Sequence, residues 1–147
     1  MKRCLIPAAA GLMLVALLMV GLSALRVEAA PLARTTATVH EIEKTGTALT
    51  YTSAISQMQF SNDGTVFLYI NNAYTGTITM TAETPGTVGG LAIADLEVAI
   101  ASETEKFVGP FRPSLFNQIS GGAQGYVYID FDTVTSVTVG AYRLSND

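Results

Sequence analysis

Few residues of this chain could do chemistry, and the first of them is its single histidine. His40 stands beside Glu41, and an imidazole in such a pair could act as a general base. No serine lies in a G-x-S-x-G nucleophile elbow, so a Ser-His-acid triad lacks its usual sequence setting. The simpler interpretation of His40 is an exposed histidine in an edge strand. We therefore expect no catalytic residue and no enzyme activity.

Two carboxylates at alternate positions, Asp130 and Asp132, form a second candidate site. On a strand they share one face about 6–7 Å apart, a separation that suits a glycosidase pair or calcium ligands. The simpler interpretation is a solvated strand face before a turn, where aspartate is common and binds nothing. The run Asn62-Asp63-Gly64 lacks the spacing of a calcium loop and is typical of a turn. We expect no metal and no cofactor, with calcium at Asp130 and Asp132 as the alternative.

Tyrosines are the third candidate. Tyr126 and Tyr128 share a strand face, and Tyr142 follows on the next predicted strand, where it would face them in a suitable register. Such a stripe could stack on a sugar, anchor a protein interface, or simply stabilise the sheet as cross-strand pairs. The chain has no tryptophan, which weakens the sugar interpretation.

These side chains depend on strands for their positions. Residues 125–144 contain two runs in which apolar and polar side chains alternate, joined by a short polar link, which predicts an antiparallel hairpin. Residues 65–70 are apolar on both faces, as in a strand that is central in a sandwich or half inside a subunit interface. That strand places Phe67 and Tyr69 on one face, and we add both to the candidate interface.

The same short alternating runs and turn signals continue along the chain, without a convincing helix after the N-terminal segment. They predict an all-β fold, a single antiparallel β-sandwich of jelly-roll or Ig-like topology with seven to nine short strands. We assign residues 37–147 to this domain. Residues 30–36 are expected to form a flexible arm before it.

The N-terminus has the layout of an export signal. Met1-Lys2-Arg3 is basic, residues 5–25 are uncharged and largely apolar, and small residues precede a cleavage point after Ala29. We predict a signal peptide over residues 1–29 and a secreted or cell-surface protein. Because the apolar run is long enough to cross a bilayer, a retained membrane anchor with the domain outside the cytoplasm is the alternative. The only cysteine, Cys4, lies in this segment, so the predicted domain has no disulfide.

Charge narrows the range of partners. Without residues 1–29 the chain keeps five basic and eleven acidic residues, a net charge of −6. Nucleic acid requires a basic surface, so we exclude it as a partner. Contact with a membrane would be made only through residues 5–25, if they are retained.

Four stretches together resemble a known group of proteins: residues 60–65 (FSNDGT), 84–95 (TPGTVGGLAIAD), 109–117 (GPFRPSLFN) and 134–144 (VTSVTVGAYRL). In order and spacing they are similar to small β-sandwich proteins of tailed bacteriophages, some of them head-decoration or other virion-surface components. The resemblance implies a non-enzymatic structural subunit that packs on a symmetric surface or on copies of itself. The export segment points to an exported relative of that group.

We therefore predict an exported, self-assembling or surface-decorating β-sandwich subunit. Its partner would be itself or a symmetric protein surface, contacted through Phe67, Tyr69, Tyr126, Tyr128 and Tyr142. The alternative is an extracellular module that binds carbohydrate or calcium through the tyrosine face or through Asp130 and Asp132.

Overall fold

The computed structural model describes residues 33–145, which belong to one compact unit that begins at Ala33. The predicted signal peptide and residues 30–32 of the predicted arm lie outside the described residues. The structure confirms the all-β class, because strands dominate and only two short helical turns occur among residues 33–145. No helix in this part of the chain is long and apolar enough to cross a membrane.

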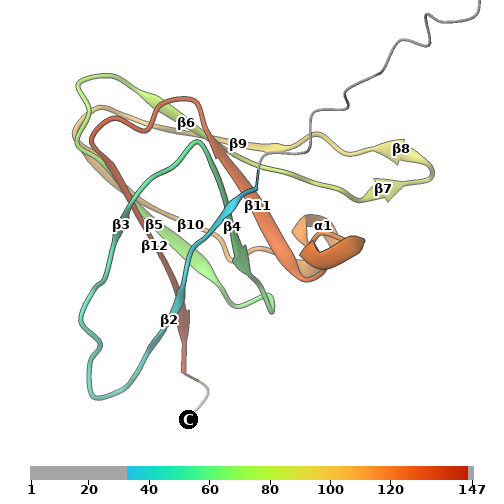
Figure 1. Cartoon of the computed structure of the whole chain (residues 1–147), viewed down its shortest axis with the longest axis horizontal. Helices are drawn as coiled ribbons and strands as arrows, with labels where there is room; N and C mark the ends of the chain where they lie inside the picture. The colour runs from blue at the N-terminus through green and yellow to red at the C-terminus, as the bar shows by residue number, and fades with distance from the viewer. Residues whose placement is uncertain (1–32, 146–147) are drawn as a thin grey trace, which may run out of the picture. The chain divides into compact units, whose positions relative to one another are not determined.

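Five strands form a first sheet, called sheet A here, in the order β1-β4-β11-β6-β9 (Figure 1). They are β1 (Thr35–Thr36), β4 (Gln57–Ser61), β11 (Tyr126–Phe131), β6 (Ile78–Ala82) and β9 (Leu96–Ile100). Neighbouring strands are antiparallel, except that β1 runs parallel to β4.

A second sheet, sheet B, has the order β10-β5-β12-β2, and β3 pairs with β12 on the same side as β2. Its strands are β10 (Thr104–Val108), β5 (Phe67–Asn72), β12 (Val137–Leu144), β2 (Val39–Ile42) and β3 (Thr52–Ser53). Here β2 is the parallel exception.

Four small elements complete the fold. The strands β7 (Thr87–Val88) and β8 (Leu91–Ala92) form a separate hairpin between β6 and β9. The helical turns α1 (Pro113–Phe116) and η1 (Gly121–Ala123) lie between β10 and β11. The prediction of seven to nine strands is thus too low, since twelve strands in three sheets are present in the described residues. Strands of two residues, such as β7 and β8, are too short to show the alternation of apolar and polar residues by which a strand is recognised in a sequence.

One hydrophobic core contains the inward side chains of both five-stranded sheets. In β11 the burial alternates residue by residue, with Val127, Ile129 and Phe131 inside, as expected for a strand with one covered face. Sheet B contributes Leu68 and Ile70 from β5 to the same cluster. Two buried asparagines, Asn62 and Asn72, lie at its edge.

The predicted closing hairpin over residues 125–144 is wrong. Its two runs do form the strands β11 and β12, but β11 pairs in sheet A with β4 and β6, and β12 pairs in sheet B. The link between them crosses from one sheet to the other. Alternation predicts which side of a strand is buried but not which strand lies beside it, so the hairpin could not be distinguished from a crossover.

The N-terminal residues that the structure describes are not a free arm. Thr35 and Thr36 pair with Met58 and Gln59 of β4, and the Ala37 N–H donates to the carbonyl oxygen of Gln59 at 2.8 Å. This differs from the flexible segment expected for residues 30–36. The side chain of Arg34, described below, accounts for much of the difference.

Candidate functional site

Six ring-bearing residues gather on the outward side of sheet B, and we call this surface the aromatic face. Neighbouring ring centroids lie 5.3–6.2 Å apart. The members are His40, Tyr51, Phe67, Tyr69, Phe107 and Tyr142.

Strand register explains why these rings meet. Phe107 of β10 lies opposite Tyr69 of β5, and Tyr142 of β12 lies opposite Phe67. Tyr142 is in turn opposite His40 of β2. Paired residues point to the same side of a sheet, so four adjacent strands align their rings in one row.

The aromatic face is open to solvent at the β10 edge, and its middle is covered. Phe107 is 67% exposed, whereas Tyr69 and Tyr142 are buried. The segment that contains Thr50 and Tyr51 lies over the centre, where the ring of Tyr51 packs on that of Tyr69 at 5.3 Å. Phe107 is the most exposed ring of the aromatic face.

Gly140 makes room for the buried tyrosine. A Cβ added there would lie 2.6 Å from Cε2 of Tyr142 and 2.9 Å from the carbonyl oxygen of Thr50. The Tyr142 ring therefore fills the space above Gly140, and its hydroxyl binds the backbone of Thr50. Burial is the main cause that raises the pKa of Tyr142, against the lowering effect of the Thr50 hydrogen bond.

Burial also raises the pKa of Tyr69 to about 12, helped by a hydrogen bond and the negative charge of Glu105. The phenol of Tyr69 is therefore neutral beneath the ring of Tyr51.

The structure divides the predicted interface residues between two surfaces. Phe67, Tyr69 and Tyr142 meet on the aromatic face, whereas Tyr126 and Tyr128 lie on sheet A with half-buried side chains. The predicted stripe that joined Tyr142 to the other two tyrosines is therefore wrong, because it depended on pairing between β11 and β12.

Sequence reasoning missed Tyr51 and Phe107 as members of the aromatic face. Phe107 belongs to β10, whose other exposed residues are Thr104, Glu105 and Lys106, so no apolar period marks it. Tyr51 precedes β3, which has only two residues. Their exposure as large aromatic side chains is visible only when the sheet is assembled.

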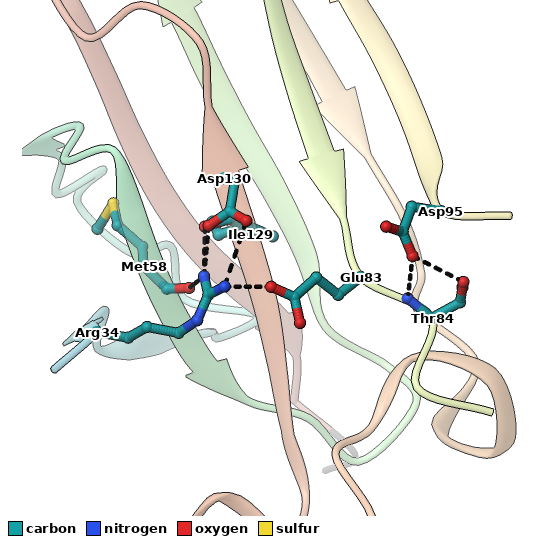
Figure 2. Close-up of polar contacts among 7 residues, drawn as sticks. All are labelled: Arg34, Met58, Glu83, Thr84, Asp95, Ile129 and Asp130. Carbon is teal, nitrogen blue, oxygen red and sulfur yellow. Dashed lines mark hydrogen bonds and ion pairs between the residues drawn. The ribbon is translucent and has the colours of Figure 1, made fainter. Parts of the chain in front are cut away.

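Sheet A carries a different cluster, centred on Arg34 (Figure 2). Its guanidinium pairs with both carboxylate oxygens of Asp130, at 2.5 Å and 3.2 Å, and with the carboxylate of Glu83. It also donates to the carbonyl oxygens of Met58 and Ile129, at 3.4 Å and 3.3 Å. We call Arg34, Glu83 and Asp130 the arginine clamp.

The clamp fixes the start of the domain onto sheet A. The Arg34 side chain is only 11% exposed, and its guanidinium carbon lies 4.2 Å from the centre of the Tyr128 ring. Such a cation over an aromatic face adds attraction to the two ion pairs. Asp130, which the sequence suggested as one of a pair of catalytic or calcium-binding carboxylates, is therefore engaged in holding the N-terminal strand β1 in place.

Two carboxylates share this one guanidinium, which leaves the clamp with excess negative charge. Burial raises the pKa of Glu83 above its ordinary value, and nearby Asp130 and Asp95 raise it further, against the lowering effect of Arg34. Asp95 itself accepts hydrogen bonds from the backbone N–H and the hydroxyl of Thr84.

Asp132 has a structural partner as well. Its carboxylate accepts the backbone N–H of Thr79 at 2.9 Å, which closes the end of the β6–β11 pairing. Asp130 thus binds the Arg34 side chain and Asp132 binds the backbone of Thr79, so the two carboxylates do not act together on one ligand. Among residues 33–145, no group of three or more His, Cys, Asp or Glu side chains is placed to hold a metal ion.

His40 lines a small cavity of about 160 Å³ where β2 and β3 separate along β12. The hydroxyl-bearing residues Thr38, Thr50 and Thr52 line it too. Its ring lies 5.9 Å from that of Tyr142, centre to centre. His40 therefore packs against Tyr142 at the β2 edge of the aromatic face.

Comparisons with models of known protein families, with curated proteins and with solved structures give no match for this chain. The resemblance to bacteriophage proteins therefore stays a prediction. The aromatic face and the arginine clamp have to be interpreted from their own geometry.

Proposed function

We propose that this chain is a non-enzymatic, exported structural protein that assembles with copies of itself or packs on a symmetric protein surface. The aromatic face is the contact surface in this proposal. The observation that carries it is Phe107, a phenyl ring 67% exposed at the open end of a row of packed rings.

The composition of the aromatic face supports a protein partner. Aromatic residues are enriched in the cores of protein interfaces, where they bury a large area at small conformational cost. Neighbouring rings of this face are tilted by 31–69° to one another. The tilted rings form an uneven surface, which suits packing against another protein better than stacking on a flat sugar ring.

The arrangement of the sheets supports a rigid β-sandwich subunit. Both five-stranded sheets contribute to one core, and the chain passes between them seven times, at β1–β2, β3–β4, β4–β5, β5–β6, β9–β10, β10–β11 and β11–β12. Crossings of this kind are usual in sandwiches of the Ig-like and jelly-roll classes. A rigid sheet holds its outward rings in place, so these side chains lose little conformational entropy when a partner binds.

The test is the mass of the protein in solution, measured by light scattering after size exclusion, with negative-stain microscopy of the same fractions. The sample is the chain as the producing cell exports it, in mild detergent if it stays with the membrane. We expect oligomers, rings or filaments. Replacing Phe107 by serine should lower the mass of these assemblies, whereas Val134→Ser, in the β11–β12 connection, should not.

A monomer at all concentrations, with no partner surface that it decorates, would contradict the proposal. Unchanged assembly of Phe107→Ser would show that the aromatic face is not the contact. Thermal unfolding of each variant checks that the fold is intact.

A glycan-binding module is the second candidate, and it uses sheet A. Tyr126 and Tyr128 lie two residues apart on β11, Tyr128 lies opposite Gln59 of β4, and all three are half-buried. Because the Arg34 guanidinium covers the Tyr128 ring, Tyr126 would provide the stacking surface for a neutral sugar. Calorimetry against a glycan panel, with Tyr126→Ala as the matched variant, tests it. No heat with any glycan would exclude it.

A further inference from the structure

The longest free edges of the two five-stranded sheets are the strands β9 and β10. β9 ends sheet A and β10 ends sheet B, and within residues 33–145 neither has a strand partner on its other side. Both have five residues, whereas the opposite edges are formed by strands of two to four residues, β1, β2 and β3. An open strand edge is a template for pairing with a strand of another molecule, so these two edges are where uncontrolled aggregation would begin.

A short turn brings the two edges together. The chain passes from β9 to β10 within residues 101–103. The buried amide of Asn72 holds this turn, because its nitrogen lies 3.1 and 2.9 Å from the carbonyl oxygens of Ile100 and Ala101. The hydroxyl of Thr104 donates to the Ala101 carbonyl oxygen as well, at 2.8 Å. The side chains of β10 therefore start from a fixed position beside β9.

The backbone of β9 directs polar groups to its open side. Thr79 of β6 donates its N–H to the Asp132 carboxylate at 2.9 Å, and its carbonyl oxygen accepts the Asp132 N–H at 3.2 Å. Both backbone groups of Thr79 thus point away from β9. In an antiparallel pair, two opposite residues point their backbone groups either toward each other or both away. Ala99 lies opposite Thr79, so its N–H and C=O face the open edge.

Lys106 of β10 occupies that edge. Its ammonium donates to the carbonyl oxygen of Ala99 at 2.6 Å. Lys106 lies opposite the buried Ile70 of β5, and paired residues point to the same side of a sheet, so its side chain leaves sheet B on the core side and reaches across to sheet A. A strand added to β9 would have to displace the ammonium from its acceptor. A strand added to β10 would cover an inward-pointing charge and remove it from water.

We propose that Lys106 protects the β9 and β10 edges against pairing with a strand of another molecule. Lysines and inward-pointing charges are the residues by which sheet proteins block addition at their edges. Contacts between copies are then restricted to the faces of the sheets, and neither sheet extends from one copy into the next. This inference goes beyond the proposed function and does not depend on it, because a monomer needs the same protection.

The test is aggregation under native conditions, followed by thioflavin T fluorescence and negative-stain microscopy, on the protein prepared as for the test of the proposed function. Lys106→Met should form thioflavin-binding aggregates with a several-fold shorter half-time than the wild type. Lys106→Thr, whose side chain is too short to reach Ala99, should do the same. Lys106→Arg keeps the charge and the reach, and should behave like the wild type.

The matched control is Lys44→Met. Lys44 is the other lysine of residues 33–145 and lies in the exposed turn after β2, so its replacement removes the same charge away from the edges. We expect Lys44→Met to aggregate no faster than the wild type. Equal aggregation of Lys106→Met and Lys44→Met would overturn the proposal, because charge alone would then explain the effect.

Hydrogen exchange read by mass spectrometry distinguishes edge pairing from unfolding. In aggregates of Lys106→Met, residues 96–100 should exchange more slowly than in the soluble wild type, and β11 should keep its protection. Loss of protection in β11 would show that the aggregates arise from unfolded chains, and would overturn the proposal. A monomeric wild type would contradict the proposed function alone, since the comparison of Lys106→Met with Lys44→Met does not depend on it.

Discussion

The hydroxyl of Tyr142 binds both backbone groups of a single residue, Thr50. It donates to the Thr50 carbonyl oxygen at 2.7 Å and accepts the Thr50 N–H at 3.0 Å. These two hydrogen bonds hold the backbone of Thr50, in the segment after β2, over sheet B.

Removing that hydroxyl should loosen the cover of the aromatic face. We expect Tyr142→Phe to lower the free energy of unfolding by about 1–2 kcal/mol, the value of two hydrogen bonds of ordinary strength. Amide exchange should accelerate in the segment around Thr50. Tyr126→Phe is the control, because it removes a hydroxyl from a half-exposed side chain and should cost less than about 0.5 kcal/mol. Equal effects of the two substitutions would contradict this role of Tyr142.

The arginine clamp gives a second prediction. Arg34→Met leaves Glu83 and Asp130 next to each other without their cation, and should cost about 2–3 kcal/mol in urea unfolding. We place the cost at the low end for a buried pair because both carboxylates keep about a third of their side chain exposed.

The matched control for the clamp is Arg143→Met. Arg143 also faces two carboxylates, Glu41 and Asp63, at 3.5 Å and 3.4 Å, but all three side chains are more than two-fifths exposed. Exposed pairs of this kind contribute about 0–1 kcal/mol. If Arg34→Met costs no more than Arg143→Met, the clamp does not hold β1 on the sheet.

The raised pKa of Glu83 makes a third prediction, on pH dependence. Because the folded state raises this pKa, mainly by burial, the folded protein binds the proton more tightly than the unfolded chain. The resulting contribution to stability is present at low pH and is lost as the pH rises through the folded-state pKa. Glu83→Gln should therefore match or exceed the wild-type melting temperature at neutral pH, and the two curves should converge on acidification.

Glu97→Gln, on the exposed strand β9, is the control for that pH profile and should follow the wild type throughout. A lower melting temperature of Glu83→Gln at neutral pH would mean that attraction to Arg34 outweighs the burial of the carboxylate.

Asn72 gives the fourth prediction. Its buried amide nitrogen lies within hydrogen-bond distance of the carbonyl oxygens of Gly76, Ile100 and Ala101, at 2.9, 3.1 and 2.9 Å. Asn72→Asp turns this donor into a buried carboxylate that faces carbonyl oxygens, and should cost about 3 kcal/mol or more. Asn71→Asp, its half-exposed neighbour on the other side of β5, should cost less than about 1 kcal/mol by thermal unfolding. Similar melting temperatures for the two variants would contradict the role assigned to Asn72.

The sequence by itself determined the all-β class, several strand positions and the side of each strand that is buried. Alternation in residues 126–131 and 137–144 predicted inward Val127, Ile129, Val137 and Val139, and all are buried. The two-faced apolar strand that carries Phe67 and Tyr69 is central in its sheet, between β10 and β12. These properties are local, because side chains two residues apart on a strand share one environment.

Tertiary structure alone decided which surfaces these side chains build. The Arg34 guanidinium meets Glu83 and Asp130, 49 and 96 residues along the chain, and no spacing in the sequence encodes that meeting. Tyr142 and Tyr128 lie on different sheets because β11 and β12 take different partners. Strand pairing depends on how whole strands pack into one core, and side-chain alternation is compatible with many such pairings.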